Sequence, residues 1–319
     1  MSFPKKDKLV CTDQSELLRK SKRRAFWHDN IVNTSMVALP FLEVVLFGFF
    51  PMIVCFALAF TELHSYNLSM AKFVGLDNFR RLWDNRAMIG LAIRNTLIFA
   101  SVVPIRLAWN LWLSNSLYKK PFGNRASRVV LFLPQVISSV AITLAWQWIF
   151  EENYGVLNTL LAAIGLPKIP FFTNEHFFRP ATILIALYGS ATNVIMLEGN
   201  FAVLNQSLEE AARLDGATER QVFWHVTFPQ LTPTLFYLLT MGLIGALQEQ
   251  AIMQVLTTNG MGPNNSAITL VYYIYKMAFS FTATDGFGMA CALSLVTGLF
   301  ITLITRLNFK LSAKWVHYD

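Results

Sequence analysis

Long apolar runs, separated by short polar segments, make up most of the sequence. An α-helix rises about 1.5 Å per residue, so about 20 mostly apolar residues cross the roughly 30 Å hydrocarbon core of a bilayer. Six runs are long enough, and they cover residues 36–60, 89–113, 129–150, 181–199, 232–256 and 289–306. The pattern therefore predicts an all-α integral membrane protein with about six transmembrane helices.

The composition favours one membrane bundle over soluble domains. Hydrophobic residues make up 54% of the 319 residues and charged residues 14%, against about 25% charged in a typical soluble domain. We expect a transmembrane domain over residues 36–306, a basic tail over 1–35 and a second tail over 307–319. The basic head is too long for a signal peptide and no small-residue cleavage site follows it, so no cleavable signal is expected.

Lysine and arginine residues are divided unequally between the two sides of the predicted bundle. An even number of spans puts both termini on one side, and the N-terminal tail alone carries eight of the 26 Lys and Arg residues. The tails and loops on that side carry seventeen, and the loops on the other side carry seven. Because basic residues accumulate on the cytoplasmic side, both termini are predicted to be cytoplasmic. The net charge of +7 fits such a tail, and no nucleic-acid partner is expected.

One basic cluster, formed by Arg80, Arg81 and Arg86, falls on the opposite side. It lies in or beside the segment Leu76–Asn85, whose apolar residues recur at helical spacing. The segment is predicted to form an interfacial helix at the membrane surface. Its apolar face would consist of Phe79, Leu82 and Trp83.

The residues that carry catalysis or bind metals form no pattern here. The three cysteines, Cys11, Cys55 and Cys291, are far apart and imply neither a metal site nor a disulfide framework. The five histidines show no metal-binding spacing, and no Ser-His-Asp or paired-carboxylate arrangement is evident. We expect no enzymatic activity, no metal and no cofactor in this chain.

The predicted cytoplasmic loop between spans four and five, Leu204–Pro229, has two helix-start signals. Ser207 followed by Glu210 forms one capping box, with Ser207 as the N-cap, and Thr218 followed by Gln221 forms a second. Gly216 suits a left-handed helix end between them. The loop is therefore predicted to be two short helices, at about 208–214 and 219–226, hinged at Asp215-Gly216.

The residue order of this loop resembles the EAA motif, which marks the permease subunits of bacterial ABC importers. The resemblance extends over about residues 36–319 and is closest to the carbohydrate-uptake group, which includes the maltose, glycerol-phosphate and lactose permeases. The sequence departs from the pattern of this group at two places, and both concern the local backbone. Leu204-Asn205 stands where the group usually has Ile-Pro, and Met261 interrupts a glycine-glycine-proline turn. The matching loop residues are Glu210-Ala211-Ala212, Asp215-Gly216-Ala217, Phe223, Phe228-Pro229 and Pro233, and further matches are Phe73–Phe79, Asn95-Thr96, Leu131–Pro134, Gly155–Asn158, Asn259–Pro263, Tyr273–Tyr275, Ala278-Phe279 and Gly288–Ser294.

This resemblance implies the fold of a type I ABC importer in a bacterial cytoplasmic membrane. It implies a second homologous permease subunit, two cytoplasmic ATPase subunits and an extracytoplasmic binding protein that delivers a sugar, an oligosaccharide by preference. The chain has no G-x-x-x-x-G-K-[ST] phosphate loop, so ATP is expected to bind to the partner subunits. The residues implied in ATPase coupling are Glu210, Ala211, Ala212, Asp215 and Gly216.

Several polar residues fall inside predicted spans, where they are often functional. Glu43 and Arg106 lie at similar depth from the cytoplasmic side and are predicted to form a structural ion pair, unless each extends independently to the headgroups. The resemblance implies sugar contacts near Gln135, Ser139, Gly189 and Gln248, with Tyr188, Asn193 and Trp146 as weaker candidates. Glu249, which follows Gln248, is a further candidate pathway residue, although on one continuous helix it would point about 100° away from Gln248. Helix–helix hydrogen bonding is the alternative role for these glutamines.

Two other classes of function stay open at this point. A proton-coupled secondary transporter could use Glu43 or Glu249 as an intramembrane carboxylate, and inverted repeats, which are not evident, would favour it. A membrane enzyme is disfavoured by the lack of a catalytic cluster.

Overall fold

The computed structural model describes residues 30, 33–63, 69, 71–119, 124–188, 190–258, 260–279 and 286–317, with the side chains of 124–127 and 132 excepted. The basic N-terminal tail and Gly189 lie outside the described residues. The chain divides into two compact units, Met1–Ala57 and Leu58–Asp319, and each is described by itself.

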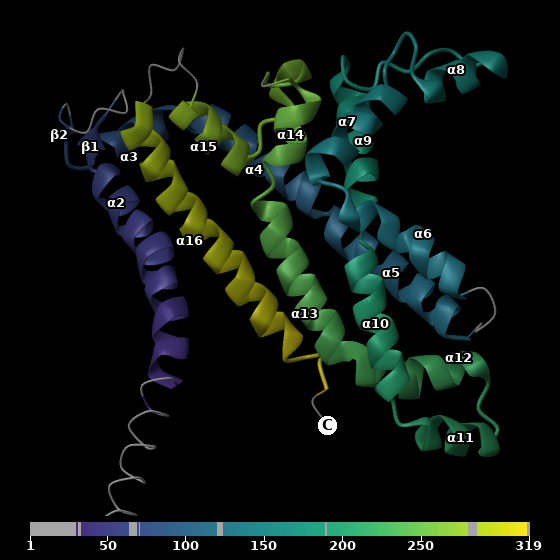
Figure 1. Cartoon of the computed structure of the whole chain (residues 1–319). Coiled ribbons are helices and arrows are strands. Elements are labelled where there is room, and N and C mark those ends of the chain that lie inside the picture. The colour runs from purple at the N-terminus through teal and green to yellow at the C-terminus, as the bar shows by residue number, and fades with distance from the viewer. Residues whose placement is uncertain are drawn as a thin grey trace, which may run out of the picture. The chain divides into compact units, whose positions relative to one another are not determined.

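The helices of the described part fit six membrane crossings (Figure 1). Four single helices are long and apolar enough to cross a bilayer, and two bent helix pairs could each supply one more crossing. This agrees with the six predicted spans in number and in approximate position. The single helices are Asn33–Leu58, Arg86–Lys119, Glu219–Leu247 and Gly286–Ser312, and the bent pairs are Arg128–Val136 with Ser139–Ile149 and Glu175–Leu187 with Ala191–Val203.

The first unit contains most of one crossing helix. It includes a π-helical turn, η1 (Val44–Phe49), which leads into α2 (Phe50–Leu58). Pro51 has no N–H and cannot donate the usual bond to the carbonyl four residues earlier, which accounts for a widened turn just before it. The side chains of this helix are mostly exposed and apolar on all sides, as expected of a membrane span.

Spans two to four of the second unit pack against one another and two of them are bent. Span two consists of α4 (Arg86–Ala100) and α5 (Val102–Lys119), and α5 packs on α10 (Ala191–Val203). The break at Ile137-Ser138, shortly after Pro134, separates α6 (Asn124–Val136) from α7 (Ser139–Ile149), and the two helices are bent by 104°. A smaller bend of 45° separates α9 (Glu175–Leu187) from α10.

Span five differs from its prediction. The expected helix over 232–256 is divided into α13 (Phe228–Leu247) and α14 (Ala251–Leu256). The polar sequence Gln248-Glu249-Gln250 forms the break, because the Glu249 side chain accepts a hydrogen bond from the Ile252 N–H at 2.9 Å and so competes with helix continuation. The break is braced from outside the helix, since the Thr269 hydroxyl donates to the Glu249 carbonyl oxygen at 2.7 Å.

The segment after α14 returns towards span two before the last crossing. It contains η4 (Pro263–Asn265) and α15 (Leu270–Phe279) and leads to α16 (Gly286–Ser312). Two buried side chains of α4 hold it in place. The Asn95 amide donates to the Asn265 and Ile268 carbonyl oxygens at 3.0 Å each, and the Thr96 hydroxyl accepts from the Leu270 N–H at 2.9 Å.

The predicted interfacial helix exists as α3 (Asp77–Asp84), beside a short hairpin of β1 (Thr61–Glu62) and β2 (Lys72–Phe73). Its location at a membrane surface stays a prediction. Of its three apolar residues, Leu82 is buried and Phe79 half-buried against the protein, whereas Trp83 is 72% exposed. Arg81 is paired with Asp77 and Glu62 at 2.8 and 3.3 Å, so internal acids neutralise part of this basic cluster.

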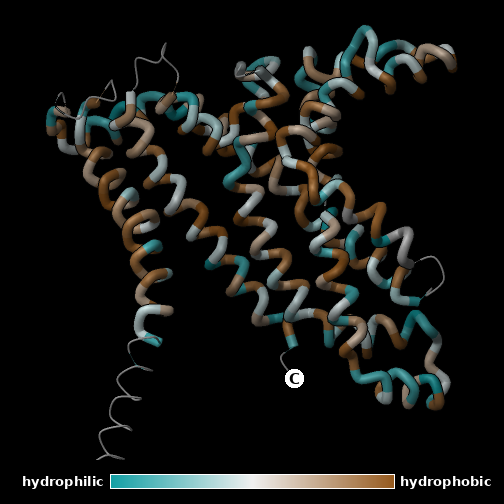
Figure 2. Tube along the Cα trace, in the orientation of Figure 1, coloured by the Kyte–Doolittle hydropathy of each residue, from teal (hydrophilic) through white to brown (hydrophobic). Residues whose placement is uncertain are grey.

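Two apolar cores lie at different levels of the second unit. One surrounds Phe150 and Ile185 near α7, α9 and α14, and the other surrounds Leu197 and Leu235 near α10 and α13. The second core also receives Trp315 from the segment after α16. Figure 1 shows the loop helices α11 (Gln206–Leu214) and α12 (Glu219–Val222) at the end of this unit opposite α8 (Val156–Ala163) and α14, and Figure 2 shows hydrophilic residues gathered along α11.

The packing of α16 against α3 predicts an intolerant glycine. A Cβ atom on Gly288 would overlap the Thr61 carbonyl oxygen and lie 3.0 Å from the Asn78 amide nitrogen, whereas nothing lies within 4 Å of a Cβ on Gly298 in the same helix. Gly288→Ala is therefore expected to destabilise the protein by about 1–3 kcal/mol, the usual effect of overpacking. Thermal unfolding of the purified variants tests this, with Gly298→Ala as the control. Equal melting temperatures for the two variants would contradict it.

Candidate functional site

The first helix of the loop between spans four and five begins two residues earlier than predicted. Helix α11 starts at Gln206, and its N-cap is Asn205, whose side chain accepts from the Ser207 N–H at 3.2 Å. The predicted N-cap role of Ser207 is therefore wrong. Asn caps helices as well as Ser does, and the residue that replaces the usual proline supplies the better-placed side chain.

The hinge after α11 agrees with its prediction. Gly216 has a φ of +86°, in the left-handed region that favours glycine. Thr218 and Gln221 form a reciprocal capping box at the start of α12. The second helix, however, does not stop near Val226. It continues through a π-helical turn, η3 (Phe223–Thr227), into α13, so that one helical segment runs over Glu219–Leu247.

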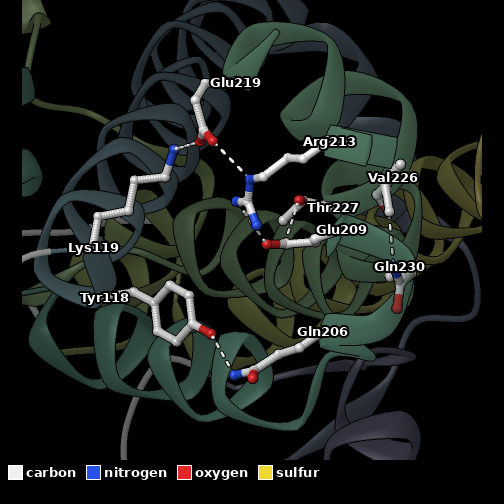
Figure 3. A network of polar contacts seen from close by, with 9 residues as sticks. All are labelled: Tyr118, Lys119, Gln206, Glu209, Arg213, Glu219, Val226, Thr227 and Gln230. Carbon is white, nitrogen blue, oxygen red and sulfur yellow. Dashed lines mark hydrogen bonds and ion pairs between the residues drawn. The ribbon is translucent and has the colours of Figure 1, made fainter. Parts of the chain in front are cut away.

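A chain of polar contacts joins this loop to the end of span two (Figure 3). Arg213 of α11 is at its centre, with Nε 2.8 Å from Glu219 and a terminal nitrogen 3.3 Å from Glu209. Lys119 of α5 lies 3.2 Å from the other oxygen of Glu219. The Thr227 hydroxyl donates to Glu209 at 2.8 Å, so the chain links α5, α12, α11 and the base of span five.

These charges favour one another's ionised forms. Hydrogen bonds from Arg213, and next from Lys119, lower the pKa of the Glu219 carboxyl. The hydrogen bond to Glu219 raises the pKa of the Arg213 guanidinium. Both side chains are exposed, so solvent screens each pair, and the network acts by fixing geometry more than by adding stability.

The side of α11 that faces away from the network is open to solvent. Leu214 is 89% exposed and Leu208 49% exposed, and Ala211 between them is also exposed. Residues spaced by three along a helix lie on one side of it, so these three form an apolar stripe, which we call the α11 face. Of the predicted coupling residues, Glu210, Ala211, Asp215 and Gly216 are exposed and Ala212 is half-buried.

The membrane part contains a cavity of about 510 Å³ between spans two, three, four and five. Gln135 and Ser139, both predicted as pathway residues, line it. Glu249 lines it as well, together with Arg106 and Tyr188. Among the described residues, no group of three or more His, Cys, Asp or Glu side chains could hold a metal ion.

Of the two adjacent pathway candidates in span five, Glu249 lines the cavity and Gln248 does not. Gln248 is exposed and does not line the cavity, because α13 ends there and the break turns the chain so that Glu249 points inward. The 100° argument assumed a continuous helix and fails for that reason. Gly189 lies outside the described residues. The Glu43–Arg106 pair stays a prediction, because the two residues belong to separate units.

The loop and the cavity belong to a chain that matches one family over more than half of its length. Residues 100–316 match the family described as binding-protein-dependent transport system inner membrane component. The chain belongs to this family. It is thus a membrane permease component of a binding-protein-dependent transport system, and the secondary-transporter alternative is not favoured.

Curated proteins support this family membership along nearly the whole chain. "Probable ABC transporter permease protein YesP" of Bacillus subtilis is 30% identical over 303 residues, which cover 93% of this permease and 96% of YesP. The lactose transport system permease protein LacF of Rhizobium radiobacter is 32% identical and covers 75% of this chain and 81% of its own. The arabinooligosaccharides permease AraP of Bacillus subtilis is 28% identical, with 86% of each chain covered.

Solved structures agree on the fold of this permease. A chain of a bacterial ABC transporter involved in the import of the acidic polysaccharide alginate matches with a TM-score of 0.75 at 24% identity, over 94% of this chain and 99% of that one. The same kind of transporter in complex with a periplasmic protein that carries an alginate pentasaccharide matches with a TM-score of 0.76 at 22% identity, over 90% and 95% of the chains. The permease therefore has the type I ABC importer fold.

The sequence reasoning missed the Arg213 network. One signal for it was present, since Glu209 and Arg213 are spaced as an i,i+4 pair on a predicted helix. Arg213 and Glu219 are 6 positions apart, and Lys119 and Glu219 are 100 positions apart. No local sequence pattern indicates either contact.

The network predicts a change in the titration of Glu219. Arg213→Gln removes the main cause of the lowered pKa, so the pKa of Glu219 is expected to rise towards its ordinary value. A carbon NMR titration of labelled glutamate carboxyls measures this, with Glu219→Gln to assign the signal. Arg220→Gln, an exposed arginine in the next helix, is the control and should leave the value unchanged.

The same lowered pKa fixes the sign of a pH effect. A carboxyl whose pKa is lower in the folded state stabilises that state at neutral pH, and the contribution is lost as the pH falls through the acidic range in which Glu219 protonates. An unchanged Glu219 titration in Arg213→Gln would show that the pair does not persist in solution.

Proposed function

We propose that this permease forms one half of the translocation pathway of an ATP-driven importer, and that the α11 face is the docking site of a separate cytoplasmic ATPase. The observation that carries this is a helix that presents an exposed apolar stripe while its opposite side is braced to spans two and five. A cytoplasmic helix that is 89% exposed at a leucine suits burial against a partner. The sequence has no phosphate loop of its own, which supports a separate motor.

The mechanism follows from the connections of the loop. When ATP closes the ATPase dimer, α11 moves with it, and the equilibrium between inward-open and outward-open states shifts because the ATPase binds one state better. The Arg213 network would carry the displacement to α5, and the continuous helix Glu219–Leu247 would carry it into span five. Gly216 provides the turn about which α11 can reorient relative to α12.

The cargo class is argued from relatives and from the cavity. Relatives are described as permeases for lactose, for multiple sugars and for arabinooligosaccharides. Amide, hydroxyl and carboxylate groups on the cavity wall suit sugar hydroxyls, and Tyr188 offers an aromatic face. The cargo is a carbohydrate, an oligosaccharide by preference, and Gln135, Ser139 and Glu249 contact it in transit.

The remaining partners follow from the same proposal. They are a second homologous permease subunit, two ATPase subunits, an extracytoplasmic binding protein and the lipid of a bacterial cytoplasmic membrane. Both termini are cytoplasmic, as the bias of basic residues indicates, and α11 then lies on the side where ATP is available.

Docking on the α11 face predicts a loss of assembly on truncation of Leu214. Leu214→Ala removes most of an exposed side chain that would be buried in the complex, worth about 1.5–3 kcal/mol when fully buried. Binding of the ATPase to the detergent-solubilised permease should weaken by about tenfold or more. Arg220→Ala, which truncates another exposed side chain, on α12, is the control. Equal affinities for the two variants would argue against this docking face.

The hinge predicts an uncoupled variant. Proline cannot adopt the φ of +86° found at Gly216, so Gly216→Pro should distort the turn while the complex still inserts and assembles. In proteoliposomes, ATP hydrolysis should continue while cargo uptake per ATP falls severalfold. Gly165→Pro, which alters another open glycine of positive φ outside the loop, should leave that ratio unchanged. Full transport by the Gly216→Pro complex would refute the coupling role of the loop.

A further inference from the structure

Arg106 is a charged residue in the middle of span two, and its guanidinium reaches the cavity wall beside span five. It lines the cavity together with Gly242 of α13. A Cβ atom on Gly242 would lie 2.8 Å from the Val103 side chain and 3.6 Å from the terminal nitrogen of Arg106. The glycine therefore allows α5 to approach α13 closely and leaves space for the guanidinium at the cavity.

The hydrogen-bonding capacity of this guanidinium is mostly unused. A guanidinium has five N–H donors, and one of them contacts the Ala186 carbonyl oxygen at 3.3 Å. Among the described residues of the second unit, no carboxylate lies within 4 Å of Arg106. The donors that face the cavity are thus available to a ligand.

The acidic residue on the same wall is already engaged. One oxygen of Glu249 accepts from the Ile252 N–H at 2.9 Å, at the start of α14. The partial positive charge of a helix N-terminus stabilises a carboxylate placed there. Glu249 is therefore held by the backbone of α14. Its charge and the charge of Arg106 attract each other across the cavity, but no ion pair within 4 Å is found between the two side chains, so the cavity-facing donors of Arg106 stay open to a ligand.

A guanidinium at membrane depth that makes no direct ion pair is unfavourable unless water or an anion solvates its free donors. The cavity volume of about 510 Å³ lies within the range of small-molecule sites and leaves room for a ligand group beside Arg106. The other walls provide Gln135, Ser139 and the half-exposed Tyr188. These groups suit the hydroxyls and apolar face of a sugar ring, while a guanidinium suits a planar carboxylate, which it binds through two parallel hydrogen bonds.

We propose that the cargo is an acidic carbohydrate, and that Arg106 pairs with its carboxylate during passage through the cavity. This inference rests on the proposed function, since it names the cargo of that same pathway. It assigns Arg106 as a specificity-determining residue, distinct from the polar residues that contact neutral hydroxyls.

The predicted ion pair of Arg106 with Glu43 is the competing role for this guanidinium, and it predicts different effects of substitution. If Glu43 and Arg106 form a permanent ion pair, either substitution removes one charge and leaves the other unpaired. Glu43→Gln and Arg106→Gln should then both lower the stability of the protein, whichever cargo is present. If Arg106 serves the cargo, Glu43→Gln should leave the preference for acidic cargo unchanged.

The first experiment is a competition for uptake by the intact importer. Proteoliposomes that contain the permeases, ATPases and binding protein are offered a mixture of neutral and uronate-containing oligosaccharides, and mass spectrometry identifies those that accumulate. We expect the uronate-containing members to accumulate. Their uptake should fall by about 10- to 100-fold in Arg106→Gln, the usual effect of losing a hydrogen bond to a charged group, and partly recover in Arg106→Lys. Arg94→Gln, on α4 and away from the cavity lining, should not reduce it.

The outcomes separate this inference from the proposed function. Uptake of neutral members alone, or an equal loss of neutral and acidic uptake in Arg106→Gln, overturns the role of Arg106 while ATP-driven carbohydrate import stands. Absence of ATP-dependent uptake of any member overturns the proposed cargo class and this inference with it.

A second measurement does not depend on the binding protein. Free glucuronate or galacturonate should raise the melting temperature of the purified complex more than the same concentration of glucose does, and Arg106→Gln should abolish that difference. Equal shifts with uronates and glucose in the wild-type complex would overturn the proposal.

Discussion

Every backbone N–H and C=O that a broken helix frees inside a bilayer must find a partner within the protein, because lipid offers none. The permease meets this constraint with a few side chains. Glu249 accepts from the N–H of Ile252, and Thr269 donates to the carbonyl of Glu249. The buried Asn95 and Thr96 satisfy the backbone of the segment that returns between α14 and α15. These contacts make an interrupted span five possible.

The interruption determines what the cavity contains. If α13 continued through Gln250, Gln248 and Glu249 would project from successive positions of one helix, about 100° apart. The break turns Glu249 to the cavity wall and engages its carboxylate, while the bends near Pro134 and between α9 and α10 bring Ser139 and Tyr188 to the same space. A polar cavity, in which the guanidinium of Arg106 keeps donors that no described acceptor uses, is the result of three separate helix breaks.

At the end of the second unit that carries α11, the proposed docking of an ATPase sets a mechanical constraint. A loop with that role must be stiff where it meets the spans and exposed where a partner would bind. The charged chain from Lys119 to Thr227 fixes α11 against two spans, although each exposed pair contributes little stability. The apolar stripe of α11 is exposed, and Gly216 lies at the turn between α11 and the helical segment that continues into span five.

The sequence by itself determined the number and approximate position of the crossings, because hydropathy over about 20 residues is a local property. It also determined the hinge at Gly216 and the cap at Thr218, since φ preference and capping act within a few residues. It misplaced the first N-cap, which moved from Ser207 to Asn205, and it treated span five as unbroken. Only the tertiary structure decided that Glu249 and Arg106 share a cavity and that Lys119 meets Glu219, because those pairings depend on how distant helices rotate and pack against one another.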